Sequence, residues 1–126
     1  KPGGHLILTA PLEWGLHQEP HDYFRYTKYG LDHLATRSGL DVEYIRPRGG
    51  LWAVLGQRWS AYLYDTYSRP LRRRGKRLAY ALSALLTLPA CAVTQLVALA
   101  LDPLQPLPND TLGYIMVATK PTGSPP

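Results

Sequence analysis

The sequence has 126 residues, of which 45% are hydrophobic and 18% charged. This is an ordinary globular composition, and it excludes a disordered acidic tail, a collagen-like repeat and a disulfide scaffold. A chain of this length can bury one hydrophobic core, so we expect one domain. The lone Cys91 lies in an apolar run and cannot form an internal disulfide. We therefore expect a buried thiol in a reducing, cytoplasmic compartment.

The positive charge is concentrated in one segment. The net charge is +5, from 14 Lys and Arg against 9 Asp and Glu, and 6 of the basic residues fall within residues 69–77. Without that segment, 8 basic residues stand against 9 acidic ones. A nucleic-acid-binding domain more often spreads its positive charge over a face, so we expect no nucleic-acid partner.

The first part of the chain predicts a strand, a loop, a helix and a second strand. Residues 5–10 form a short apolar run that is typical of a buried strand. After a long loop, Thr27 can cap a helix over residues 28–38, which Gly39 ends. Residues 41–46 are rich in β-branched and aromatic side chains, which favours a strand.

The second part predicts two helices and a last strand. Apolar and aromatic residues recur at helical spacing over residues 52–68, where we expect a helix that ends before the next proline. Residues 78–101 hold no charged side chain and predict a second helix, kinked or broken at Pro89. Residues 111–120 indicate a strand, and residues 122–126 a disordered tail.

Four segments together resemble the class I S-adenosylmethionine-dependent methyltransferases, in particular the methyltransferase type 11-like domain. KPGGHLILTAP at residues 1–11 is similar to the family's "KPGG-strand-TxP" segment. HDYFRYTKYGL at residues 21–31 resembles the approach to the helix after the fifth strand, and SGLDV at residues 38–42 the turn into the sixth. GYIMVATKP at residues 113–121 would be the seventh, antiparallel strand.

The resemblance implies an α/β fold, with residues 1–121 forming the C-terminal portion of a Rossmann-like methyltransferase sheet (its last three strands) and a helical insertion at about 51–108. It also implies S-adenosylmethionine as the cofactor. The family's glycine-rich turn and acidic residue, which bind this cofactor, have no counterpart here, because Gly3-Gly4 and Gly49-Gly50 are turn glycines. We therefore expect the cofactor to be bound mainly by an N-terminal half, and this fragment alone to be inactive.

The loop over residues 11–26 is the candidate catalytic segment, because ligands of open α/β sheets lie beyond the carboxyl ends of the strands. Methylation of a hydroxyl or amine requires a base, and histidine has a suitable pKa. We expect His21, which matches the histidine of the family's loop, and then His17 to be the base. A structural imidazole is the alternative for each. The candidates for binding the substrate are Trp14, Asp22, Tyr23, Arg25 and Tyr26.

The same loop also contains the ligand types of a two-histidine, one-carboxylate metal site: His17, Glu19, His21 and Asp22. Pro20 breaks the helical spacing that such a site needs. We therefore expect no metal.

The basic segment and the apolar run after it suggest a membrane. Residues 78–101 pass the length test for a transmembrane helix, but a single crossing would place the last strand on the wrong side of the bilayer. We expect two apolar helix segments, hinged at Pro89, that lie on a membrane surface or cover a lipid-like acceptor. The basic side chains expected to meet anionic headgroups are Arg72, Arg73, Arg74, Lys76 and Arg77. Helices of a soluble core or of a dimer interface are the alternative.

The hypothesis from sequence is a methyltransferase that acts on a small, apolar or lipid-linked acceptor, in the cytoplasm or peripherally on the inner face of the membrane. A homodimer remains open. The alternative function is a non-catalytic module for membrane attachment or interaction, derived from the methyltransferase fold.

Overall fold

The structure is a computed structural model that describes residues 1–17, 19–105 and 110–123. The chain divides into two compact units. The sheet unit comprises residues 1–49 and 111–126, and the hairpin unit comprises residues 50–110. The hairpin unit coincides with the segment expected as a helical insertion. Of the predicted disordered tail, residues 124–126 lie outside the described residues.

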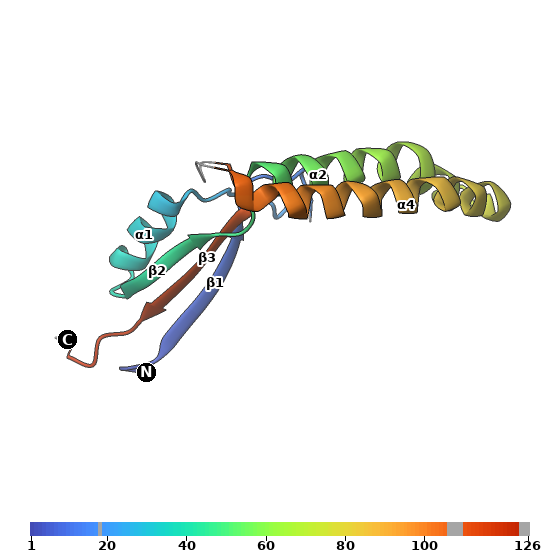
Figure 1. The fold of residues 1–126 in the computed structure, drawn as a ribbon. Helices are drawn as coiled ribbons and strands as arrows, with labels where there is room; N and C mark the ends of the chain where they lie inside the picture. The colour runs from blue at the N-terminus through green and yellow to red at the C-terminus, as the bar shows by residue number, and fades with distance from the viewer. Residues whose placement is uncertain (18, 106–109, 124–126) are drawn as a thin grey trace. The chain divides into compact units, whose positions relative to one another are not determined.

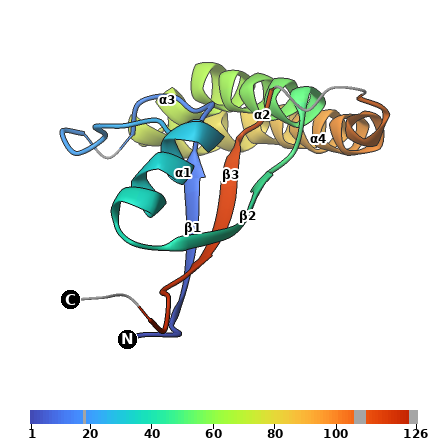
Figure 2. The same cartoon turned by 90° about the vertical axis from the view of Figure 1, so that its left-hand side faces the viewer.

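The sheet unit contains three strands in the order β1-β3-β2. These are β1 (His5–Pro11), β2 (Asp41–Pro47) and β3 (Gly113–Thr119). Strand β3 lies between the other two and pairs antiparallel with both, as Figure 2 shows. Strands β1 and β2 therefore run in the same direction. The predictions of a mixed α/β fold and of an antiparallel last strand are confirmed.

Helix α1 (Lys28–Arg37) covers one face of this sheet. The predicted cap is present, because the Thr27 hydroxyl accepts the Gly30 amide at 3.2 Å. Gly39 has a φ of +67° just after the helix, a conformation that glycine adopts without strain. The core under the helix consists of Ala10, Leu31, Ala35, Tyr114 and Met116.

A closely packed corner lies within the sheet unit, where β2 ends and β3 begins. The Thr111 side chain is fully buried, and its hydroxyl accepts the Arg48 amide at 3.1 Å and lies 2.8 Å from the Gly113 carbonyl. Gly113 has no room for a side chain, because a Cβ there would lie 2.3 Å from the Ala10 carbonyl oxygen. This corner fixes the register with which β3 enters between β1 and β2.

Strand β1 is far more exposed than its sequence predicts. Of its seven residues only Ala10 is buried, and Ile7 is 69% exposed. The prediction of a buried strand is wrong for the described chain, because β1 is the edge of the sheet. Its alternate side chains, Ile7 among them, point to the face opposite α1, which no described helix of the sheet unit covers.

The hairpin unit is an antiparallel pair of long helical arms that lie side by side (Figure 1). The outgoing arm is continuous in helical conformation from residue 51 to residue 73, and the returning arm is a single helix. In chain order the elements are α2 (Leu51–Leu63), a π-helical turn (Tyr64–Ser68), α3 (Arg69–Arg73), α4 (Arg77–Leu101) and a 3-10 turn (Asp102–Leu104).

Three predictions about these helices are wrong. The first arm does not end before Pro70, because the wide π-helical turn ahead of it accommodates the missing N–H and the chain continues as α3. Helix α4 is not broken at Pro89, so the two expected segments are one helix, which packs along α2. Cys91 is half-buried rather than buried, with its Sγ 3.5 Å from the Ser60 carbonyl.

Candidate functional site

Asp22 organises the loop between β1 and α1. The Arg25 guanidinium binds both of its carboxylate oxygens, with Nη2 at 2.6 Å from Oδ2. The backbone amide of His17 donates to the same Oδ2 at 3.0 Å, and Arg25 Nη2 also donates to the Gly15 carbonyl at 3.3 Å. The structure therefore brings His17, Asp22 and Arg25, all predicted site residues, into one cluster.

These contacts set the charges of the cluster. The Arg25 guanidinium, together with the His17 amide, holds the pKa of the Asp22 carboxyl well below its usual range. The same pairing raises the pKa of Arg25. Both groups are therefore ionised at neutral pH, and the pair is a fixed bidentate anchor for the loop.

The His17 ring is oriented by this anchor. Its Nδ1 lies 3.1 Å from the Gly15 carbonyl and 3.4 Å from Asp22 Oδ2. Both neighbours are acceptors, so Nδ1 carries the proton and Nε2 is left as the basic nitrogen. A histidine held in one tautomer by a carboxylate and a carbonyl is suited to accept a proton.

His21 has a different environment. Its ring is exposed, and its only described hydrogen bond joins Nδ1 to the Tyr23 hydroxyl at 3.1 Å. Tyr23 is itself exposed, whereas Trp14 is half-buried and Tyr26 packs against the core under α1. Tyr26 therefore has a packing role, whereas substrate binding by Trp14 and Tyr23 stays a prediction.

The described residues form no binding site for the adenosine and methionine groups of S-adenosylmethionine. The strand–glycine–helix junction at Gly49-Gly50, before α2, is already filled by side chains of the chain itself. Asp102 accepts the amides of Gly50, at 2.8 Å, and of Ala53, at 3.0 Å. The side chain of Gln105 accepts the next amide, that of Leu51. The carboxylate satisfies the helix N-terminus, so the residues present do not fit the cofactor.

Among the described residues, no group of three or more His, Cys, Asp or Glu side chains is arranged to hold a metal ion. The loop acids and histidines considered from sequence therefore do not converge on a common point where a metal ion would bind. Asp22, whose Oδ2 lies 3.4 Å from His17 Nδ1, is instead paired with Arg25.

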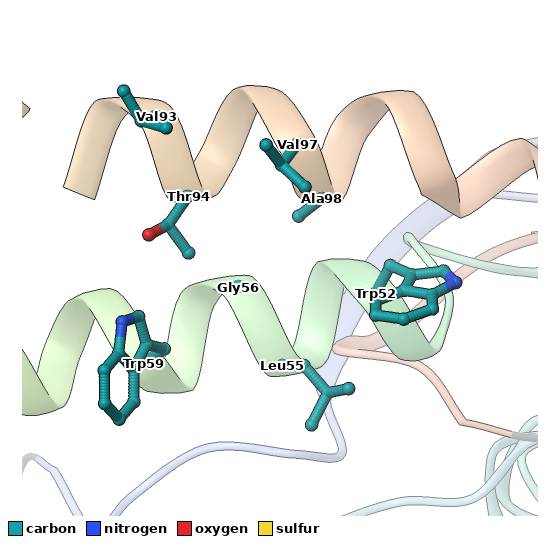
Figure 3. A pocket seen from close by; sticks show the side chains of 8 residues that line it. All are labelled: Trp52, Leu55, Gly56, Trp59, Val93, Thr94, Val97 and Ala98. Atoms are coloured by element: carbon teal, nitrogen blue, oxygen red, sulfur yellow. The ribbon is translucent and has the colours of Figure 1, made fainter. Parts of the chain in front are cut away.

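An apolar groove runs between α2 and α4 within the hairpin unit (Figure 3). Its volume is about 370 Å³, within the range of ligand pockets, and its walls are almost entirely carbon. Trp52 and Trp59 stand at either end of the α2 side, and the helices approach closely at Gly56. The lining residues are Trp52, Leu55, Gly56, Trp59, Val93, Thr94, Val97 and Ala98.

The predicted basic cluster lies at the turn of the hairpin, between α3 and α4. Arg72, Arg73, Arg74, Lys76 and Arg77 are all exposed. The first of them donates from Nη1 to the Tyr64 hydroxyl at 3.3 Å, which lowers the pKa of that tyrosine. The other four have no acidic partner among the ion pairs of the described residues.

One helix in the described part of the chain, Arg77–Leu104, is long and apolar enough to cross a membrane, with a mean hydropathy of 2.0. Length and composition alone support this statement. Only 11% of its most apolar window is buried.

Sequence reasoning missed two polar groups that shape the hairpin. Asp102, which caps α2 across the unit, carries no signal in the sequence, because its partner is about fifty residues away. Ser68 is fully buried, with its Oγ 2.7 Å from Thr87 Oγ1 and 3.0 Å from Ser83 Oγ. The serine and threonine at four-residue spacing in an apolar helix could have indicated such a contact.

A scan against models of known protein families finds no match to this chain, and a search of curated proteins likewise finds no matching sequence.

Proposed function

We propose that this chain is the C-terminal part of an S-adenosylmethionine-dependent methyltransferase that acts on a small, apolar or lipid-linked acceptor at the cytoplasmic side of a membrane. The cofactor would be bound mainly by residues N-terminal to Lys1, since the described residues do not fit it. The resemblance of the four sequence segments is the origin of this proposal.

The exposed apolar strand β1 is the observation that carries it. Leu6, Ile7 and Leu8 are all exposed, although strands of this composition are normally covered on both faces. The sheet with α1 on one face only supplies two layers of an arrangement in which helices cover both faces. Further strands beside β1 and helices on the open face would bury these side chains.

Within this proposal, His17 is the better candidate for the base and His21 the second. Methylation of a hydroxyl or amine leaves a proton on the acceptor atom, and Nε2 of a histidine fixed at Nδ1 can take it up. Asp22 and Arg25 then act as positioning residues, because they hold the loop and the His17 ring. Trp14 and Tyr23 would contact the acceptor.

The second candidate function is membrane attachment without catalysis. It rests on the hairpin unit alone, whose exposed leucines would contact lipid without any catalytic residue. Under both functions the hairpin contacts lipid, so only an assay of methyl transfer distinguishes them.

The test uses the full-length gene product that contains this chain. It is incubated with S-adenosylmethionine carrying a radioactive methyl group and with a total lipid extract, and the label in the organic phase is counted. His17→Ala should lower turnover by roughly 10²-fold, the scale of a lost general base. His21→Ala should have the smaller effect.

His33→Ala is the matched control, because His33 is an exposed histidine on α1 outside the loop. It should leave turnover unchanged. A full-length protein that binds vesicles but transfers no methyl group to any lipid or small-molecule fraction would leave the attachment module as the function.

A further inference from the structure

The two arms of the hairpin meet through small and hydroxyl-bearing side chains. Gly56 on α2 faces Ala98 on α4, and a Cβ on the glycine would lie only 2.6 Å from that of the alanine. Further along, Gln95 Nε2 donates to Ser60 Oγ at 3.1 Å. At the far end, Ser68 lies against Ser83 and Thr87. The interface thus contains few of the large apolar side chains of either arm.

The large apolar side chains of α4 point outward instead. Leu85 is 70% exposed and Leu86 75% exposed, values expected for polar surface residues in water. The other exposed leucines of α4 are Leu78, Leu82, Leu88, Leu96 and Leu99, whereas Val93 and Val97 line the groove toward α2.

In a water-soluble helix pair the leucines lie at the interface and the polar residues outside. This pair has small or hydroxyl-bearing residues at the interface and leucines outside. In lipid there is no hydrophobic gain from hiding leucine, and helices associate through small residues and hydroxyl hydrogen bonds. Burying the small side chains of Gly56 and Ala98 gains little in water. The small residues at the α2–α4 interface and the exposed leucines of α4 are therefore typical of a helix surrounded by lipid acyl chains.

Apart from the turn and the two ends of α4, the charged side chains of the hairpin helices lie on the other arm. Arg58, Asp65 and Arg69 are spaced by 7 and 4 residues, which places them along one face of the α2–α3 arm, and all three are exposed. The last two form an ion pair at 3.0 Å. Helix α4 after Arg77 carries no charge at all. A hairpin with one charged arm and one uncharged arm is suited to lie along an interface rather than to span it.

The aromatic residues of α2 occupy an intermediate position. Trp59 and Tyr62 stack with ring centroids 5.5 Å apart, and both are about half exposed. Trp52 lies on the same side, at a spacing of seven residues. Indole and phenol rings concentrate at the boundary between headgroups and acyl chains.

We propose that the hairpin unit inserts side-on into one leaflet of an anionic bilayer. Helix α4 lies among the acyl chains, the Trp52–Tyr62 row lies at their boundary, and the arginines of the α2–α3 arm and of the turn contact lipid phosphates. Anionic lipid is the occupant of this surface because the basic cluster at residues 72–77 complements its charge. The inference rests on the proposed membrane role but not on methyl transfer.

Nitroxide labels at two positions of the 126-residue chain test this orientation. In a Cys91→Ala background, one label is placed at Leu85→Cys on α4 and one at Thr66→Cys on the α2–α3 arm. Both positions are exposed and flank the Ser68–Thr87 contact, so they lie at similar levels along the hairpin. Accessibility to oxygen and to a water-soluble nickel complex is measured by power saturation on phosphatidylglycerol vesicles.

The expected result is a Leu85→Cys label that is accessible to oxygen and shielded from nickel, and a Thr66→Cys label with the reverse pattern. Equal shielding of both labels from nickel would indicate a spanning hairpin and overturn the side-on orientation. Nickel access at both would indicate binding through charge alone and would also overturn it.

The proposed membrane role fails separately, if neither labelled chain sediments with the vesicles. In that case light scattering without lipid identifies the other occupant. Growth of the molecular mass with concentration, together with immobilisation of the Leu85→Cys label, would assign the α4 face to a second copy of the chain.

Discussion

At the scale of single residues, Asp22 determines the shape of the candidate catalytic loop. It contacts a guanidinium, a backbone amide and an imidazole, whereas the other predicted acid of the loop, Glu19, is exposed. Removing a carboxylate that holds two loop segments together should loosen both segments. Protonation of Asp22 removes the same charge, so the order of the loop should depend on pH.

We predict that the order of the loop is lost in acid. The folded pKa of Asp22 lies below its unfolded value of about 3.9, so the carboxylate contributes stability that is fully present above that value. The contribution falls as the pH decreases through the folded pKa. Hydrogen exchange of the His17 amide should therefore become faster, relative to its intrinsic rate, as the pH falls below about 4.

Two variants check the assignment. Asp22→Asn should show fast exchange of the His17 amide at every pH, because the charged acceptor is gone. Asp32→Asn, on the exposed side of α1, should retain the wild-type profile. A protected His17 amide in Asp22→Asn would show that the carboxylate does not hold the loop.

The sequence could suggest which residues take part in this loop but not how they are arranged. Histidines, an acid and an arginine within nine residues predict some polar cluster. The ranking of His21 over His17 came from a resemblance, whereas the orientation of His17 depends on the Gly15 carbonyl. A backbone carbonyl carries no sequence signal, so this part of the site could not be predicted.

At the scale of elements, the close approach of α2 and α4 depends on Gly56 and Ala98. The two positions leave the helices no space for extra atoms, since even a Cβ at residue 56 would lie 2.6 Å from the alanine methyl group. The helices are rigid elements packed along their length, so a larger side chain cannot be accommodated by a local shift alone.

We predict that Ala98→Leu destabilises the hairpin by about 1–3 kcal/mol, the usual cost of overpacking. Ala92→Leu makes the same chemical change at an exposed position of α4 and should change the free energy of unfolding by less than about 0.5 kcal/mol. Urea unfolding followed by tryptophan fluorescence measures both, because Trp52 and Trp59 line the adjacent groove. Equal stabilities of the two variants would contradict close packing at this contact.

The elements themselves were largely predictable, and their failures have physical causes. Strands and α1 were found within a residue or two, because turn glycines, prolines and a capping threonine mark their ends. Helix continuity through Pro70 and Pro89 was missed, because proline lowers helical propensity locally while packing along the opposite arm acts over the whole length. Burial of β1 was overestimated, since an apolar run does not reveal whether a strand lies at an edge.

At the scale of the whole molecule, charge and apolar surface are distributed unequally. Six basic residues lie within residues 69–77, and α4 carries a long row of exposed leucines, so the hairpin unit combines both features. Electrostatic attraction and apolar burial at one membrane surface would therefore act through the same unit.

Our last prediction is that replacing Arg72, Arg73 and Arg74 together by Gln weakens binding to anionic vesicles by about two decades. Each basic residue near such a surface contributes about 1 kcal/mol, and about 1.4 kcal/mol corresponds to a tenfold change in affinity. Raised salt should weaken wild-type binding in the same way, because it screens the charges. Co-sedimentation with phosphatidylglycerol vesicles at two salt concentrations measures both effects.

The matched control removes three positive charges from the sheet unit instead, by replacing Lys28, Arg37 and Lys120 with Gln. All three are exposed, so the net charge falls equally while the hairpin is unchanged. Its affinity should fall by much less than that of the arginine variant, because the charges that it removes do not belong to the inserted unit. Equal losses would mean that net charge rather than the turn of the hairpin attracts the lipid, and salt-insensitive binding of the wild type would exclude an electrostatic contribution altogether.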